Sequence, residues 1–418
     1  MAGPCDSLAA MPSQHRSTRP RSIGTSADAV QVSPELEWVL ARAFAGSEGT
    51  RSGFLDGRAA GALASRLGLL PRIVHRLGPA RLADELGPVA AKDALAEYRE
   101  SALVSARLVA LARLVGRVAG ENGIKVVVLK HAALCLSGIS LPAERGAADA
   151  DILVSDADAA RLTRELVRAG IRTSDAPVYD HQHSPLYHPQ GGMLELHRTI
   201  PGVRPSPDDA EMSLEVLVAR DLATPLDPGA PCLFVPRPHF MLAHALAHAL
   251  FQHGLQPGAY PALKLLADIA DLRCRASHDL LPDALPLIVA EIDEGDARAA
   301  WALPTALAAG GAAAVLACSD SPEARLLSHL LRGALDPGYG ESLKLRSALT
   351  LPSDQSGPLA FLRWAWHTVA INRAQAWALY GADTRPKFLF ALARRPFHLA
   401  WKLGRYIKAA ARGGADRP

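Results

Sequence analysis

An abrupt change of hydrophobic period at Glu121–Asn122–Gly123 constrains the fold more than any other feature of this sequence. From about residue 31 to 119, apolar residues recur at the spacing of an amphipathic helix, which predicts an all-helical region. Directly after the turn, Lys125–Lys130 is a β-branched run typical of a buried strand. A sheet is therefore expected inside a chain whose remainder favours helices.

The window from residue 120 to 200 predicts a small α/β unit. Ser155, with an acidic residue three positions later, is a variant of the capping box that opens a helix, and Gly170 suits the end of that helix. Pro189–Gly192 is a hairpin turn signal. The elements expected in this window are strand 125–130, helix 132–136, strand 148–154, helix 155–169, strand 171–173 and strand 193–200.

Helical periodicity returns after Pro201 and continues with interruptions to about residue 410. Within it, the uncharged stretch Ala299–Ser319 is interrupted by Pro304 and by Gly310–Gly311, so two buried helices are predicted rather than a membrane span. The expected fold class is α+β and mostly helical, with a small α/β core embedded between N-terminal and C-terminal helical regions. The expected regions are a disordered tail at 1–30, a helical region at 31–119, the core at 120–200, a helical domain at 201–384 and a basic helix and tail at 385–418.

Charge and cysteine content argue against several broad classes of protein. The net charge is only +3 over 418 residues, so no global positive field points to nucleic acid. The five cysteines are widely spaced and include no C-x-x-C pair, which argues against a disulfide framework or a structural zinc site. The N-terminal residues lack the apolar run of a signal peptide. A cytoplasmic location with reduced thiols is therefore expected.

Three acidic residues in the predicted strands form a candidate site. Asp149 and Asp151 are two apart on one strand and therefore project from the same face. Adjacent carboxylates repel unless a cation lies between them, and Mg²⁺ accepts carboxylates together with substrate phosphates. Glu195 lies on a later strand, between two leucines, and a neighbouring position in the sheet would bring it beside the aspartates. We therefore predict an acidic triad that is both catalytic and metal-binding.

Several histidines accompany the acidic residues. His197 is two residues from Glu195, shares its strand face and is a further site candidate. His244 and His248 are four residues apart on a predicted helix, a spacing that can bind metal. No glutamate follows His244, so packing against the core is preferred over a zinc site for this pair.

Together these motifs resemble those of uncharacterised bacterial nucleotidyltransferases in the DNA polymerase β-like superfamily. The matching residues are Leu129-Lys130, Arg145, Asp149, Asp151-Ile-Leu-Val154, Gly170 and Glu195-Leu-His197. The helical flanks are also similar, at Leu63–Pro71 upstream and at His244, His248 and Asp268–Leu272 downstream. The resemblance spans roughly residues 35 to 275.

The resemblance implies transfer of a nucleotidyl group from an NTP, expected to be ATP, to an acceptor hydroxyl or phosphate. Asp149 and Asp151 would bind Mg²⁺ or Mn²⁺, and Glu195 would bind a second metal ion or deprotonate the acceptor. Lys130 and Arg145 would offer positive charge to the phosphates. The alternative for Lys130 is a solvated charge at a strand end, and for Arg145 an ion pair with a nearby aspartate.

One position departs from the family pattern, because His131 stands where the family has glycine after Leu-Lys. A small residue there lets backbone N–H groups approach the phosphates. The imidazole of His131 would crowd that approach, bind phosphate itself, or mark a degraded site. The alternative function is therefore a catalytically impaired, nucleotidyltransferase-like binding or scaffold protein of a biosynthetic cluster.

Residues 385–412, here called the basic segment, contain eight Lys/Arg and no Asp/Glu, with five aromatic residues interleaved. This pattern fits a peripheral membrane surface, an acidic partner or nucleic acid. It also fits a packed helix with a solvated basic face. The packed helix is the preferred interpretation of this composition.

Overall fold

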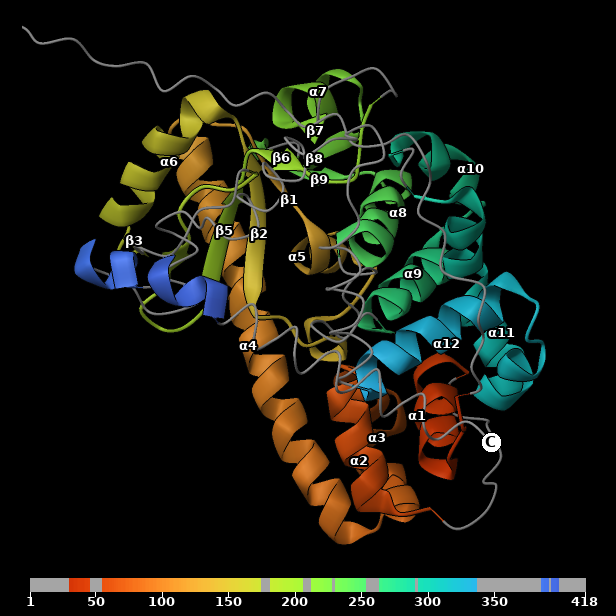
Figure 1. The fold of residues 1–418 in the computed structure, drawn as a ribbon. Coiled ribbons are helices and arrows are strands. Elements are labelled where there is room, and N and C mark those ends of the chain that lie inside the picture. Colours follow the sequence, from red (N-terminus) through yellow and green to blue (C-terminus); the bar gives the residue numbers. More distant parts are fainter. Residues whose placement is uncertain are drawn as a thin grey trace, which may run out of the picture.

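A mixed seven-stranded sheet packs among helices that precede and follow its strands in the sequence (Figure 1). The expected α+β class, mostly helical, is confirmed. A computed structural model describes residues 30–45, 55–173, 181–205, 212–227, 230–252, 263–289, 292–336, 385–390 and 392–397. The predicted disordered tail, apart from Val30, lies outside the described residues.

The sheet has the strand order β3-β4-β5-β2-β1-β9-β8. Its central strand, β2, runs antiparallel to β1 and parallel to β5, while β1 runs parallel to β9. A separate two-stranded ribbon contains β6 (Thr199–Ile200) and β7 (Met212–Ser213). The strands of the large sheet are β1 (Val126–Val128), β2 (Asp149–Val154), β3 (Arg172–Thr173), β4 (Leu186–Tyr187), β5 (Met193–His197), β8 (Ala223–Asp227) and β9 (Ala230–Pro236).

Helices cover the sheet and extend the core away from it. The long helix α4 (Pro88–Glu121) contacts β1, β2 and β9, and it also contacts α3 in the N-terminal region. The short helix α5 (Lys130–Leu136) contacts β2 and lies against α8. The remaining N-terminal and central helices are α1 (Pro34–Phe44), α2 (Gly57–Arg66), α3 (Leu70–Leu86), η2 (Pro142–Glu144), α6 (Asp156–Arg168) and α7 (Leu214–Ala219).

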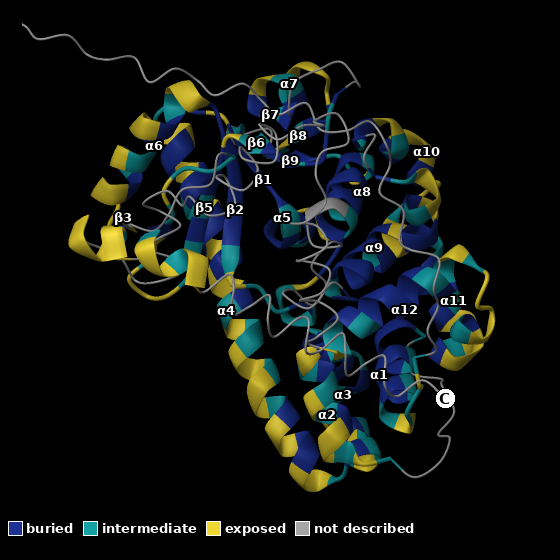
Figure 2. Cartoon of the chain, viewed as in Figure 1, coloured by how far each residue is buried: buried dark blue, intermediate teal, exposed yellow. Residues whose placement is uncertain are grey.

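The helices after the sheet pack back onto those that precede it. Helix α11 contacts α1, α9 and α12, so helices that precede the sheet and helices that follow it share one hydrophobic core. Figure 2 shows buried residues along the sheet and on the inner faces of these helices. The later helices are α8 (Pro238–Ala247), η3 (His248–Gln252), α9 (Leu263–Arg275), α10 (Leu281–Ala284), η5 (Leu285–Leu287), α11 (Glu294–Ala317) and α12 (Pro322–Leu335).

Local signals read from the sequence are found at several element ends. The Ser155 hydroxyl accepts a hydrogen bond from the Asp158 N–H at 3.1 Å and opens α6. Gly170 follows α6 with φ of 94°, a conformation that glycine adopts without strain. Both features confirm the predicted boundaries of this helix, which then directs the chain back toward the edge strands.

The prediction that the chain turns helical directly after Pro201 is wrong. Strands β8 and β9 follow, and β9 extends the sheet by pairing with β1. Pro225 lies on the edge strand β8 and Pro236 ends β9, two places in a sheet where proline is tolerated. The predicted strand at 193–200 likewise ends at His197, and its last residues join the separate ribbon. The proposed region boundaries remain predictions.

Helix α11 includes the uncharged stretch predicted to form two buried helices. It is kinked at Gly311, where φ is 75°, as the glycine pair indicated. Among the described residues, it is the helix long and apolar enough to cross a membrane, and 44% of its most apolar window is buried inside the fold. One side of it packs against α1, α9 and α12.

The kink in α11 is held by a side chain from the other end of the chain. Glu37 on α1 accepts hydrogen bonds from the Ala312 N–H at 3.1 Å and the Ala313 N–H at 2.9 Å. These N–H groups begin the second half of α11, where the kink leaves them without intrahelical acceptors. A carboxylate at this place also opposes the positive end of the half-helix.

We predict that Glu37→Ala lowers the free energy of unfolding by about 1 kcal/mol, because one part-buried and one exposed N–H group lose a charged acceptor. Denaturant titration of the full chain measures this change. Glu100→Ala is the matched control, since Glu100 is exposed on α4, and it should change stability by less than about 0.5 kcal/mol. Equal effects of the two substitutions would rule out the bridge as a stabilising contact.

Candidate functional site

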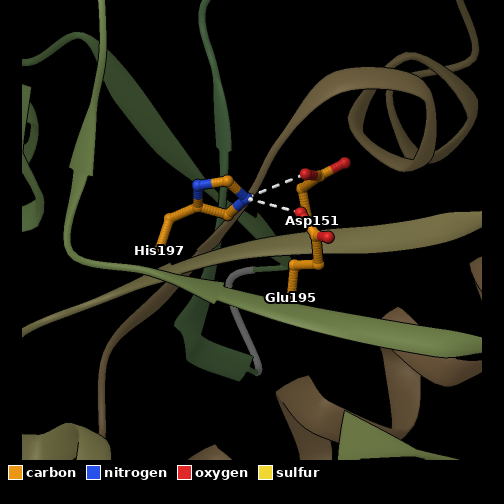
Figure 3. Close-up of side chains that lie close together, drawn as sticks. All are labelled: Asp151, Glu195 and His197. Atoms are coloured by element: carbon orange, nitrogen blue, oxygen red, sulfur yellow. Dashed lines mark hydrogen bonds and ion pairs between the residues drawn. The ribbon is translucent and has the colours of Figure 1, made fainter. Parts of the chain in front are cut away.

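The register between β2 and β5 brings the predicted acidic residues together. Asp151 is directly opposite Glu195 in this parallel pair, and His197 follows two residues later on the same face of β5. One ligand atom from each of these three side chains lies within 4.8 Å of the others. Figure 3 shows the imidazole and both carboxylates pointing toward one another. We call Asp151, Glu195 and His197 the strand cluster.

Asp151 is the most buried acid of the cluster, with 3% of its surface exposed. Its Oδ1 lies 2.7 Å from the Lys130 ammonium and 2.8 Å from Nε2 of His197. Burial alone would raise the pKa of Asp151, but Lys130 and His197 outweigh that effect and hold the pKa well below its usual range. Asp151 is therefore ionised, and its partners come from the start of α5 and from β5.

Glu195 is less buried and is more weakly held. Its Oε2 accepts a hydrogen bond from the Gln182 side-chain amide at 2.7 Å and lies 3.7 Å from Nε2 of His197. Burial and the charges of Asp151 and Asp149 raise the pKa of Glu195. Its carboxylate is thus a better proton acceptor than an ordinary glutamate.

Gln182 was not identified from the sequence. It forms an isolated bridge with His197, and the His183 N–H donates to the Leu196 carbonyl at 2.7 Å, so this segment runs beside β5. The ring of His181 stacks on His197 with centroids 5.9 Å apart. No local pattern marks Gln182, because its place is set by pairing with a strand that lies later in the chain.

Asp149 lies at the start of β2, opposite Met193, and is not one of the three residues of the strand cluster. Burial and the charge of Asp151 raise the pKa of Asp149, so it is close enough to act on the site electrostatically. The close group among the described residues therefore contains His197 where the predicted triad had Asp149. The assignment of Asp149 as a metal ligand remains a prediction.

Positive charge gathers beside the carboxylates. Arg145 is buried, and its Nε lies 3.0 Å from Oδ1 of Asp268 on α9, so the ion pair considered as an alternative is present. Burial raises the pKa of Asp268 to about 6. Lys264, also on α9, has its pKa lowered to about 8 by burial and by Arg145, and the charge of Asp149 also acts on it. Lys264 was missed because a lone lysine on a helix carries no motif.

The turn from β1 into α5 explains how a histidine is accommodated after Lys130. Lys130 itself has φ of 50°, a left-handed conformation that costs a non-glycine residue energy. His131 is not among the described residues with positive φ, so its side chain adds no backbone strain of this kind. Its ring is buried and lies 3.6 Å from Sγ of Cys135 one turn later. Burial lowers the pKa of His131 well below its usual value, which favours the neutral ring.

A pocket opens between α5, α8 and α9, and Lys130 of the pocket lining reaches Asp151 of the strand cluster. We call it the helical pocket. Its apolar wall is formed by Leu134, Pro236, Met241, Ala245, Leu265 and Leu272. Its polar lining residues are Lys130, Arg145, His244, His248 and Asp268.

The histidine pair predicted to pack against the core lines this pocket. His244 and His248 are both buried, with ring centroids 6.2 Å apart. Burial and the nearby Lys130 ammonium lower the pKa of His244 to about 3, so its ring is neutral. Neither residue belongs to a group of three potential metal ligands among the described residues. These observations agree with a packing role.

We predict that Lys130→Met lowers the free energy of unfolding by about 2–3 kcal/mol, because the buried Asp151 carboxylate loses one of its two partners. In the Asp151→Asn background, the same change should cost less than about 1 kcal/mol. Methionine keeps a long side chain at Lys130, so this double-mutant cycle measures the interaction between the two charges. Lys125→Met, at an exposed position before β1, is the control. Additive effects of Lys130→Met and Asp151→Asn would disprove the coupling.

Comparison with known proteins and families identifies the family of this chain. No curated protein and no solved structure matches it. Residues 56–309, which include every residue of the strand cluster and the helical pocket, match the family described as "Uncharacterised nucleotidyltransferase". This match covers more than half of the chain and agrees with the resemblance read from its motifs. The chain therefore belongs to the uncharacterised nucleotidyltransferase family.

Proposed function

We propose that this protein transfers a nucleotidyl group from an NTP, expected to be ATP, to an acceptor hydroxyl or phosphate. The observation that carries the proposal is the direct pairing of Asp151 with Glu195 on adjacent parallel strands. Carboxylates from neighbouring strands, with cationic side chains beside them, suit a reaction that depends on positioning and charge rather than on a covalent intermediate. Family membership supports the same class of reaction.

The donor atoms of the strand cluster fit a divalent cation. Two carboxylates are the oxygen ligands that Mg²⁺ and Mn²⁺ prefer, and the imidazole of His197 is more compatible with Mn²⁺ than with Mg²⁺. Asp149 and Asp151 on β2 would hold the ion, and Glu195 on β5 would bind a second ion or deprotonate the acceptor. When bound, such an ion neutralises triphosphate charge and acidifies an attacking hydroxyl.

Different side chains of this protein would bind the phosphates and accept the proton during the transfer. Lys130 and Arg145 place positive charge beside the carboxylates, where the phosphates of the NTP would lie. Glu195, with its raised pKa, would accept the proton of the acceptor hydroxyl. The acceptor oxygen forms a bond to the α-phosphorus as the bond from that phosphorus to the β-phosphate oxygen breaks, and pyrophosphate leaves.

We predict that the wild-type chain binds an NTP with Mg²⁺ or Mn²⁺ and releases pyrophosphate in a screen of hydroxyl and phosphate acceptors. The variant Asp149→Asn/Asp151→Asn should lose at least about a hundred-fold in rate, because two carboxylates no longer hold the cation. Calorimetry and a pyrophosphate assay measure the two steps. Asp93→Asn, exposed on α4, is the control and should behave as wild type. A wild-type chain that binds no nucleotide, or a double variant of equal activity, would refute the proposal.

A catalytically impaired binding or scaffold protein of a biosynthetic cluster is the second candidate. The observation in its favour is that Asp151 is already engaged by Lys130 and His197, while His131 replaces the small residue of the family. Nucleotide binding without pyrophosphate release in the same assays would favour this candidate. A His131→Gly variant that gains activity would favour it further, because the glycine would restore backbone access to the phosphates.

We further propose that the basic segment binds an anionic membrane surface. Residues 385–390 and 392–397 are helical, and Leu389, Phe390 and Phe397 expose 58%, 67% and 77% of their surface. Exposed aromatic residues beside Arg385 and Arg394, in a segment without acidic residues, complement anionic headgroups and the acyl region below them.

We predict that the full chain pellets with phosphatidylglycerol–phosphatidylcholine vesicles but not with phosphatidylcholine alone. Phe390→Ser/Phe397→Ser should weaken this binding by about ten-fold or more, because the two rings would no longer insert into the bilayer. Leu103→Ser, at a site 52% exposed on α4, is the control for lost surface hydrophobicity. Equal binding to both vesicle types, or no effect of the phenylalanine substitutions, would contradict the assignment.

A further inference from the structure

The helical pocket shares a residue with the strand cluster. Lys130 lines the pocket, and its ammonium lies 2.7 Å from Oδ1 of Asp151. His244, another lining residue, is close enough for the charges of Lys130 and Asp151 to act on its ring. A ligand seated in the pocket would therefore present one end to the carboxylates on β2 and β5.

The polar groups that line the pocket already interact with other groups in the protein. Arg145 is paired with Asp268, Lys130 with Asp151, and the two histidine rings lie against each other. A hydroxyl-rich ligand would exchange its water for few new hydrogen bonds there, which opposes its burial. The wall left for a ligand is mainly formed by leucine, methionine, proline and alanine side chains.

We propose that the helical pocket receives an apolar ring or branched aliphatic group of the acceptor, so that the acceptor is an alcohol or phenol carried on such a group. This inference rests on the proposed nucleotidyl transfer and names the acceptor class for it. The hydroxyl would lie at the Lys130 end of the pocket, facing the strand cluster.

The same geometry distinguishes the acceptor from a sugar and from the nucleotide. A sugar carries hydroxyls on every side, and a nucleobase carries several donors and acceptors, whereas the apolar wall offers them no partners. The triphosphate is strongly anionic and is better placed outside this wall, beside the ammonium and guanidinium groups. The pocket therefore suits the apolar part of the acceptor best.

The test uses the full chain and three small probes, which are 4-ethylphenol, cyclohexylmethanol and glucose. Saturation-transfer NMR reports their binding without nucleotide, and calorimetry reports the binding of ATP with Mg²⁺. Ala245→Phe fills the pocket from α8, at a half-buried position. Ala110→Phe adds the same ring at an exposed position on α4 and serves as the control.

Wild type and Ala110→Phe should bind both apolar alcohols and not glucose. Ala245→Phe should weaken binding of both apolar alcohols by about ten-fold or more, while its affinity for ATP with Mg²⁺ changes by less than about two-fold. Nuclear Overhauser effects between the ethyl group of the phenol and the Met241 methyl locate the probe even if Ala245→Phe does not fold.

Three results would overturn the inference: glucose binding in the pocket, unchanged phenol binding by a folded Ala245→Phe, or no contact between the phenol and Met241. Loss of ATP binding in folded Ala245→Phe would also overturn it, because the pocket would then belong to the nucleotide. Failure of wild type to bind ATP would instead refute the proposed function. The alcohol measurements need no nucleotide, so the two failures remain distinguishable.

Discussion

The buried charge of Asp151 is the constraint on which the arrangement of the site depends. An isolated carboxylate inside a protein is costly unless charged or hydrogen-bonding partners surround it. Here the partners are Lys130, at the start of α5 just after β1, and His197 on β5. Both contacts require β2 to lie between β1 and β5 in the observed register, so pairing of the strands and neutralisation of the acid are coupled.

A second ion pair ties the helices to this core. Arg145, in the loop before β2, is joined to Asp268 on α9, and the Ser105 hydroxyl on α4 donates to the Arg145 carbonyl at 2.6 Å. The loop that delivers β2 is therefore held from both sides of the fold. Because α9 and α11 also pack together, the N-terminal and C-terminal helices support the same site.

Local sequence patterns predicted much of the core, whereas pairing between strands far apart in the chain could not be predicted from the sequence. The alternation at Asp149 and Asp151 and the cap at Ser155 depend on neighbours within four residues, and the structure has both. Strand β9 lacks such a signal because its place depends on pairing with β1, about a hundred residues earlier in the chain. Gln182 and Lys264 were missed for the same reason, since only the folded chain brings them to the carboxylates.

Lys130 links the two parts of the site energetically. Its ammonium balances Asp151, and its side chain forms part of the helical pocket, from a backbone position with φ of 50° that costs energy to maintain. Any ligand that draws this ammonium away from Asp151 changes the charge available to a cation on the strand cluster. By linkage, a cation that replaces Lys130 beside Asp151 would change the affinity of the pocket for its ligand. The ligand would change the affinity of the cluster for the cation by the same factor. Under the proposed function, Lys130 would thus couple occupation of the carboxylates to occupation of the pocket, in either order of binding.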